Sequence, residues 1–214
     1  KCKEVPIINI NNKRVYKVDK YSMYFPNDIS NQSLDRKFLS DEIIINHYGE
    51  REGAIITSRG WAFDCAFCGW ARSLNKDVAI RTRNEESVIR EISEILAIYP
   101  DIQSIRILDD LFLRNRSSVD MAYRIFSTFP QVKWRGMVHA LSLVNSLDKI
   151  GKLRDCNCRE LFMGIESGSN KIREKINKSG TIDEILTVAT EILRNGIDLK
   201  GYFIYGFPQE TEDD

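Results

Sequence analysis

The chain has 214 residues, of which 43% are hydrophobic and 29% charged, as is ordinary for a globular protein with one sizeable core. Lys and Arg total 31, as do Asp and Glu, so the zero net charge gives no support to a nucleic acid or an anionic membrane as the main partner. No apolar run approaches the roughly 20 residues of a membrane span, and the first residues do not have the pattern of a signal peptide. Five sparse cysteines do not form a secreted disulfide framework, so we expect a reducing, cytoplasmic location.

The first 50 residues differ in pattern from the rest. Residues 6–10 and 13–18 are short extended runs on either side of Asn11 and Asn12. Asn tolerates the left-handed conformation, so this pattern predicts a small hairpin. A polar, loop-like stretch follows at residues 26–33. We therefore predict a lead-in or linker over residues 1–50 and, because the chain starts at Lys and ends just after a turn, a fragment of a longer protein.

From about residue 53, extended and helical patterns alternate along the chain. Asn84 is placed to cap the first helix, and Thr181 with Glu184 forms a capping box before the last. Asn195 and Gly196 are expected to end that last helix. Strands are predicted at residues 54–58, 104–108, 132–138, 161–165 and 199–205, and apolar stripes predict helices at 88–99, 121–129, 143–153 and 182–193.

This alternation predicts a parallel α/β architecture over residues 51–214. Several strands end in polar or glycine-rich turns, as in a TIM-type barrel whose chemistry lies at the carboxyl ends of its strands. Five strands do not close an eight-stranded barrel. The prediction is therefore a partial (β/α) barrel whose C-terminal units lie outside this chain.

The most informative segment is residues 56–69, which contains the sequence Cys65-Ala66-Phe67-Cys68. Two thiolates in this spacing can hold one metal ion or two corners of an iron–sulfur cluster. Taken alone they are equally a pair of structural thiols. Trp61 lies four positions before Cys65, where a cysteine would complete the spacing CxxxCxxC.

CxxxCxxC is the signature of radical SAM enzymes, and this loop resembles theirs with Trp61 at the first ligand position. Three further motifs follow in the order typical of that superfamily. Residues 107–112, 164–169 and 201–211 are similar to the ends of its second, fourth and fifth strands. The resemblance is to the branch that often carries an N-terminal cobalamin-binding domain, and it covers residues 51–214.

The resemblance implies ligands for a 4Fe–4S cluster and for the methionine part of S-adenosylmethionine (SAM). Cys65 and Cys68 would bind the cluster. Asp109 or Asp110 would face the amino group of SAM, and Arg135 would pair with its carboxylate. Left open are a capping role for the two aspartates and a structural ion pair for Arg135.

The resemblance also implies contacts to the nucleoside part of SAM. Phe67 would meet the adenine, Glu166 and Ser167 would reach the ribose hydroxyls, and Gly206 would let the backbone approach the adenine closely. The open alternatives are a charge at a helix start for Glu166 and simple turn chemistry for Gly206. Four other side chains are read as structural or solvated: Lys178, His139, Cys156 and Cys158.

Trp61 decides what the resemblance can mean for activity. An indole N–H donates a hydrogen bond and has no lone pair for a metal, so Trp61 cannot replace a thiolate. Rescue by the adjacent Asp64 is disfavoured because carboxylate is a harder ligand than iron–sulfur clusters take. We therefore predict a radical-SAM-like protein with impaired or lost radical chemistry.

Two alternatives stay open at this point. In the first alternative, the parent protein is an active radical enzyme for methyl transfer or other C–H functionalisation, and this sequence carries a substitution at position 61. In the second alternative, the chain is a non-catalytic SAM-binding or scaffold partner of an active homologue. The first alternative implies SAM, a 4Fe–4S cluster, an electron donor such as flavodoxin or ferredoxin, and cobalamin in the longer protein. The substrate cannot be predicted.

Overall fold

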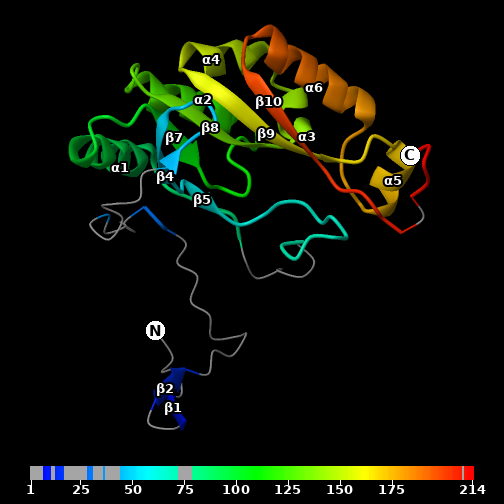
Figure 1. Cartoon of the computed structure of the whole chain (residues 1–214), viewed down its shortest axis with the longest axis horizontal. Helices are drawn as coiled ribbons and strands as arrows, with labels where there is room; N and C mark the ends of the chain where they lie inside the picture. The colour runs from blue at the N-terminus through cyan, green and yellow to red at the C-terminus, as the bar shows by residue number, and fades with distance from the viewer. Residues whose placement is uncertain are drawn as a thin grey trace.

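In the computed structural model, a curved six-stranded sheet carries its helices on one face (Figure 1). The residues described are 7–10, 13–16, 28–30, 36, 44–71, 79–208 and 210–214. The order of the strands in the sheet is β10-β9-β8-β7-β4-β3. Their bounds are β3 Ile44–Ile45, β4 Arg51–Ile55, β7 Ser104–Ile107, β8 Lys133–Val138, β9 Cys158–Glu166 and β10 Asp198–Phe203.

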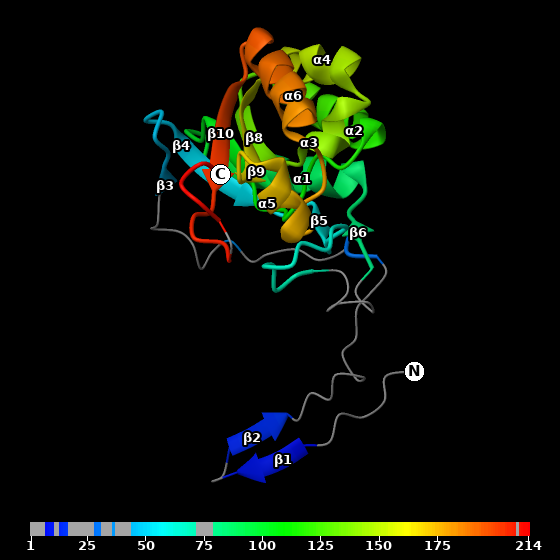
Figure 2. The ribbon, with the colours of Figure 1, turned by 90° about the vertical axis from the view of Figure 1, so that its right-hand side faces the viewer.

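The five strands from β4 to β10 are parallel, and only the short β3 pairs antiparallel with its neighbour. Each parallel step is made through a helix that packs against the same face, which leaves the concave face open (Figure 2). This is the half-barrel predicted from the alternation of strands and helices. The helices are α1 Glu85–Ile98, α2 Arg116–Ser127, α3 Ala140–Val144, α4 Ile150–Asp155, α5 Asn170–Lys175 and α6 Ile182–Arg194.

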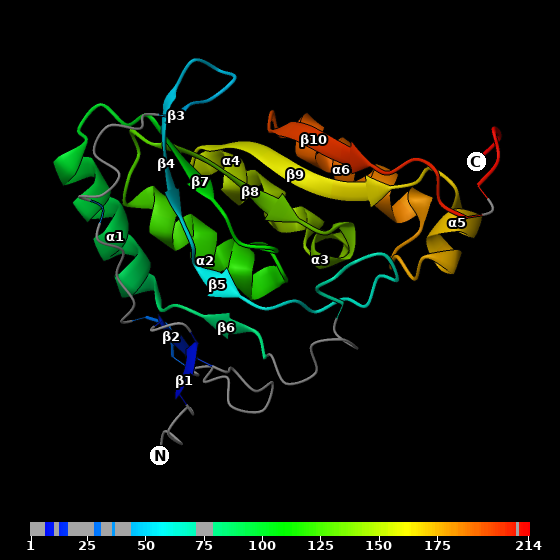
Figure 3. The ribbon, with the colours of Figure 1, turned by 60° about the horizontal axis from the view of Figure 1, so that its bottom comes forward.

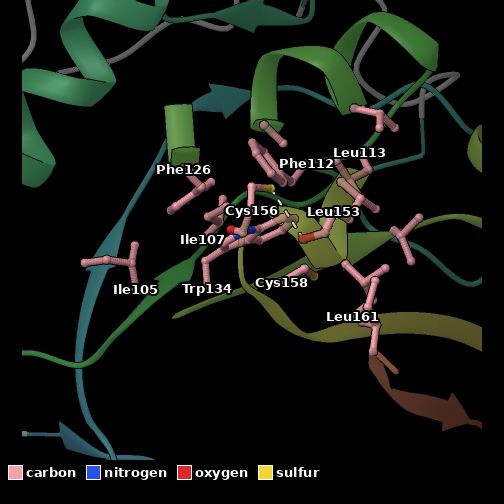
Figure 4. Packing of buried hydrophobic residues seen from close by; sticks show 14 of the residues in the cluster. Ile105, Ile107, Phe112, Leu113, Phe126, Trp134, Leu153, Cys156, Cys158 and Leu161 are labelled. Atoms are coloured by element: carbon pink, nitrogen blue, oxygen red, sulfur yellow. Dashed lines mark hydrogen bonds between the residues drawn. The ribbon is translucent and has the colours of Figure 1, made fainter. Parts of the chain in front are cut away.

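The core lies between the helices and the convex face of the sheet (Figure 4). Trp134 of β8 is fully buried there, stacked on Phe126 of α2 with ring centroids 4.8 Å apart. Its indole N–H donates to the carbonyl of Cys156 at 2.8 Å, which satisfies the only polar atom of the side chain. Cys156 and Cys158 are buried in the same cluster, as expected of packed thiols.

The predicted helix ends are confirmed, because local capping decides them. The side chain of Asn84 accepts a hydrogen bond from the backbone of Ser87, and Thr181 forms a capping box with Glu184. Gly196, which follows α6, adopts φ +70°, the left-handed conformation typical of a helix C-terminus.

Two predicted elements are divided in the structure. The extended run at residues 54–58 belongs to two sheets: β4 ends at Ile55, and β5 (Ser58–Arg59) pairs antiparallel with β6 (Arg81–Thr82). The helix expected at 143–153 breaks at Asn145 and continues after a 3₁₀ turn over Leu147–Lys149. β3 and α5 were not predicted from the sequence. They have two and six residues, and elements this short are too short to show a hydrophobic periodicity.

The predicted N-terminal hairpin is confirmed: β1 (Ile7–Ile10) pairs antiparallel with β2 (Lys13–Tyr16). Asn11 and Asn12 between the two strands lie outside the described residues. Closer to the sheet, the backbone N–H of Asn84 donates to the hydroxyl of Ser30, so part of the predicted lead-in contacts the start of α1. Among the described residues, no helix is long and apolar enough to cross a membrane.

Candidate cofactor site at the carboxyl ends of the strands

The loop that carries the two cysteines runs along the carboxyl ends of the parallel strands toward α5 (Figure 3). It is fixed there by the segment that follows α5. The backbone N–H of Ala66 donates to the carbonyl of Ile176 at 2.8 Å, and the side-chain amide of Asn177 donates to the carbonyl of Asp64 at 2.7 Å. The loop therefore bridges the first and fourth strands of the half-barrel.

Asp109, at the end of β7, holds the beginning of this loop. Its buried carboxylate accepts hydrogen bonds from the backbone N–H and hydroxyl of Thr57 and from the hydroxyl of Ser58, each at 2.6 Å. These three donors use most of the acceptor sites of the carboxylate, and Asp109 is only 2% exposed, so in this structure its side chain holds the loop. The expected contact of Asp109 with the amino group of SAM stays a prediction, whereas the capping role left open for it is not found, because its partners come from an earlier loop rather than from the next turn.

Asp110 is left as the acidic group of this pair that faces outward. Burial raises the pKa of its carboxyl group, as does the charge of Asp109, while the nearby cation Arg59 acts in the opposite direction. Asp110 lines a cavity together with Trp61 and Cys68. The prediction that an acidic group at this strand end faces a ligand therefore rests on Asp110.

Trp61 packs into a row of aromatic rings at the same end of the sheet. Its indole meets Phe63 edge-on, with centroids 5.6 Å apart, and Phe63 stacks on His139 at 4.0 Å. His139 also caps α3 by accepting a hydrogen bond at Nδ1 from Leu141. Burial, with the charges of Lys178 and Arg173, lowers the pKa of His139 to about 3, so its ring is neutral at physiological pH.

The two cysteines of the loop differ in their surroundings. Cys65 is buried and Cys68 is partly exposed, and the backbone N–H of Cys68 donates to the carbonyl of Cys65 at 3.1 Å. Burial raises the pKa of the Cys65 thiol, against the opposing effect of the Lys178 charge. The pair is thus held in one tight turn, with one sulfur accessible.

These residues do not provide the ligand set of a 4Fe–4S cluster bound through three thiolates. Trp61 stands where the spacing CxxxCxxC would need a cysteine, and its Nε1 is a buried donor without a hydrogen-bond partner in the described part of the chain. No cluster of three or more His, Cys, Asp or Glu side chains able to hold a metal occurs within the described residues. The donor chemistry is therefore two thiols beside an indole that cannot coordinate iron.

Glu166, at the end of β9, has a strained backbone and a buried partner. Its φ is +68°, which is unfavourable for a residue with a Cβ, and its carboxylate pairs with the ammonium of Lys178 at 3.1 Å. Both side chains lie over the backbone of Gly164, where an added Cβ would collide with the Glu166 carboxylate. Lys178, read from the sequence as a solvated charge, is buried instead. Strain of this kind is typical of functional sites.

Ser167 and Gly206 line one cavity of about 630 Å³ with Glu166, between the ends of β9 and β10. Gly206 has φ +88° and open space where a Cβ would be. Phe67 of the cysteine loop contacts Phe207 next to this cavity, with ring centroids 5.6 Å apart. The structure therefore brings the residues predicted for the nucleoside part of SAM to one end of the sheet.

Arg135 lies apart from this group, in the amino-terminal half of β8. Its guanidinium pairs with Glu52 at 2.7 Å and with Glu160 at 2.8 Å, and all three side chains are buried on the concave face. The two carboxylates occupy the donors of Arg135. This corrects the expectation that Arg135 binds the carboxylate of SAM and supports the structural ion pair left open above.

One basic residue of the concave face was overlooked in the sequence, although a signal for it exists. In Ser104-Ile105-Arg106-Ile107, alternate residues point to opposite faces of β7. Ile105 and Ile107 are buried in the core, which places Arg106 on the open face, where it is exposed. Arg106 lines the same cavity as Trp61 and Asp110.

The fold is a parallel half-barrel, and the cysteine-bearing loop after its first strand lies over the carboxyl ends of the other strands. This arrangement is typical of a class of proteins that bind cofactors at those strand ends. The chain belongs to the radical SAM superfamily, whose family model matches residues 55–214.

Curated relatives include an uncharacterised methyltransferase of Pyrococcus horikoshii, 34% identical over 165 residues, which cover 76% of this chain and 34% of the relative. A tRNA-2-methylthio-N(6)-dimethylallyladenosine synthase of Buchnera aphidicola is 28% identical over 166 residues, which cover 70% of this chain and 36% of that protein. The chain thus spans about a third of the length of these relatives.

Solved structures with the same fold include two cobalamin-associated radical SAM enzymes. The cobalamin-dependent enzyme OxsB, solved with aqua-cobalamin and SAM, has a TM-score of 0.62 at 20% identity, covering 71% of this chain and 23% of OxsB. The methyltransferase TsrM of Kitasatospora setae, solved with tryptophan and a SAM analogue, has a TM-score of 0.62 at 17% identity, covering 76% of this chain and 32% of TsrM.

Proposed function

We propose that this chain binds SAM at the carboxyl ends of β9 and β10 and that Trp61 prevents the cysteine loop from holding a 4Fe–4S cluster through three thiolates. The observation that carries the proposal is the contrast between the two halves of the site. Glu166, Ser167 and Gly206 line one cavity, whereas only Cys65 and Cys68 remain as cluster ligands.

The cavity at β9 and β10 suits a nucleoside in size and chemistry. Its volume of about 630 Å³ falls within the roughly 300–1,000 Å³ of small-molecule sites. The carboxylate of Glu166 and the hydroxyl of Ser167 can accept hydrogen bonds from ribose hydroxyls. At Gly206 no Cβ obstructs the approach of a ring to the backbone. SAM is the ligand that membership of the superfamily favours.

We also propose a reaction for the whole protein, and this proposal rests on its relatives. A methyltransferase and a tRNA methylthiolation enzyme are among the curated relatives, so we place the parent protein with SAM-dependent group transfer to a substrate. OxsB and TsrM were solved with cobalamin bound, which makes cobalamin part of this proposal. A corrinoid absorption spectrum in the protein purified from cells grown with cobalamin tests that part.

Binding of SAM to the purified chain, measured by isothermal titration calorimetry without iron, tests the proposal. We expect the wild type to bind SAM and Glu166→Gln to bind it at least about tenfold more weakly, because a charge-assisted hydrogen bond to the ribose is lost. Glu94→Gln is the matched control, because Glu94 is exposed on α1, away from the cavity. A folded wild type that does not bind SAM would contradict the proposal.

A further inference from the structure

A second cavity, of about 310 Å³, lies on the concave side of the half-barrel, under the cysteine loop. Trp61 and Trp70 of the loop, Met137 of β8 and Phe162 of β9 form apolar walls. Trp61, at the expected position of a cluster ligand, is thus part of the aromatic wall of this cavity. A space of this size fits one ring with a short side chain.

Arg106 places a positive charge in this cavity. Its guanidinium lies over the ring of Phe162, 5.4 Å from the centroid. Within the described residues, no carboxylate forms an ion pair with Arg106 and no hydrogen bond from its side chain occurs. Ile105 and Ile107 anchor the same strand in the core, so the base of the Arg106 side chain is held in place.

Two other charged residues near the cavity, Arg135 and Asp109, already have partners. The guanidinium of Arg135, which also lies 5.4 Å from the centroid of the Phe162 ring, is neutralised by Glu52 and Glu160. Asp109 is occupied by the donors of Thr57 and Ser58. Asp110 also lines the cavity; burial raises the pKa of its carboxyl group, and the charge of Arg59 acts in the opposite direction. Among the described residues that line this cavity, Arg106 is therefore the cation left to bind an anion.

We propose that this cavity binds a small ligand with a flat apolar ring and a carboxylate, which pairs with Arg106 while the ring packs between Trp61, Trp70 and Phe162. A guanidinium presents two parallel N–H donors that match a carboxylate. The walls exclude water from one side of this pair, which strengthens it. The role of the ligand as the substrate rests on the proposed function, but its binding does not.

Ligand-observed NMR titrations with the full chain, without SAM, test the cavity alone. The probes are 3-phenylpropionate and its neutral counterpart 3-phenylpropan-1-ol, which share the ring and the chain length. We expect the wild type to bind the acid about tenfold more tightly than the alcohol, as one charge-assisted pair allows. Equal affinities in the wild type would overturn the proposal, whatever the variants do.

Variants assign the effect to the named residues. We expect Arg106→Gln to bind the acid only as well as the alcohol, and Arg106→Lys to keep part of the preference. Arg90→Gln is the matched control, because Arg90 is exposed on α1. Trp70→Ala should weaken both probes, since it removes an apolar wall. Unchanged preference for the acid in a folded Arg106→Gln would also overturn the proposal. Because SAM is absent, failure here is distinguishable from failure of SAM binding.

Discussion

The carboxylate of Asp109 accepts hydrogen bonds from both the backbone N–H and the hydroxyl of Thr57, each at 2.6 Å. This contact joins the end of β7 to the start of the cysteine loop. Asp109→Ala would leave these donors buried and unpaired, so we expect the free energy of unfolding to fall by about 3 kcal/mol. Urea denaturation of this variant beside Asp155→Ala, at an exposed aspartate, measures the difference. Equal stabilities of the two variants would show that Asp109 does not hold the loop.

Removal of Arg135 should destabilise the protein more than removal of an exposed arginine. Arg135→Met leaves Glu52 and Glu160 buried without a counter-charge, which costs about 3–5 kcal/mol. The control is Arg194→Met, because Arg194 is 73% exposed beside its partner Glu191. Thermal unfolding of both variants measures the effect. If Arg135→Met instead weakened SAM binding and left stability unchanged, the assignment of Arg135 to an ion pair would be wrong.

His139 should make the protein less stable as the pH falls. The pKa of His139 is about 3 in the folded chain, against about 6.5 in an unfolded chain. Below pH 6.5 the unfolded state therefore binds a proton that the folded state does not. The stability attached to His139 is present above pH 6.5 and is lost toward pH 3, by up to about 1.4 kcal/mol per pH unit.

Urea denaturation of the wild type and His139→Asn between pH 4 and pH 7 isolates this contribution. Asn can also accept the capping hydrogen bond from Leu141 at the start of α3 but does not titrate. We expect the stability of the wild type to fall more steeply with decreasing pH than that of the variant. Parallel curves would mean that His139 is not the group responsible.

Gly206 should be sensitive to substitution because of its backbone and not because of crowding. It adopts φ +88°, and apart from its chain neighbours no residue has an atom within 4 Å of the position of a Cβ. Gly206→Ala is therefore expected to lose about 1 kcal/mol of stability. Gly168 lines the same cavity with equally open space and without a positive φ, so Gly168→Ala should be nearly neutral. Chemical denaturation compares the two, and equal losses would refute the conformational argument.

The parts of the fold that the sequence predicts are those with local causes. The capping box at Thr181 and the glycine at Gly196 depend on neighbouring residues, and both are found as predicted. The partners of Asp109 and Arg135 depend on contacts between strands far apart in the chain. A motif read along the sequence gives the strand end on which a side chain lies but not which donors already occupy it. For this reason the motif at Asp109 and Asp110 left open which carboxylate is free.

The central claim is that Trp61 alone separates this loop from one that holds a cluster. Anaerobic reconstitution with iron and sulfide, followed by iron determination per chain, tests it in the wild type and in Trp61→Cys. We expect about four irons per chain in Trp61→Cys, as in a 4Fe–4S cluster, and far fewer in the wild type. About four irons in the unchanged protein, or no cluster in either protein, would contradict it.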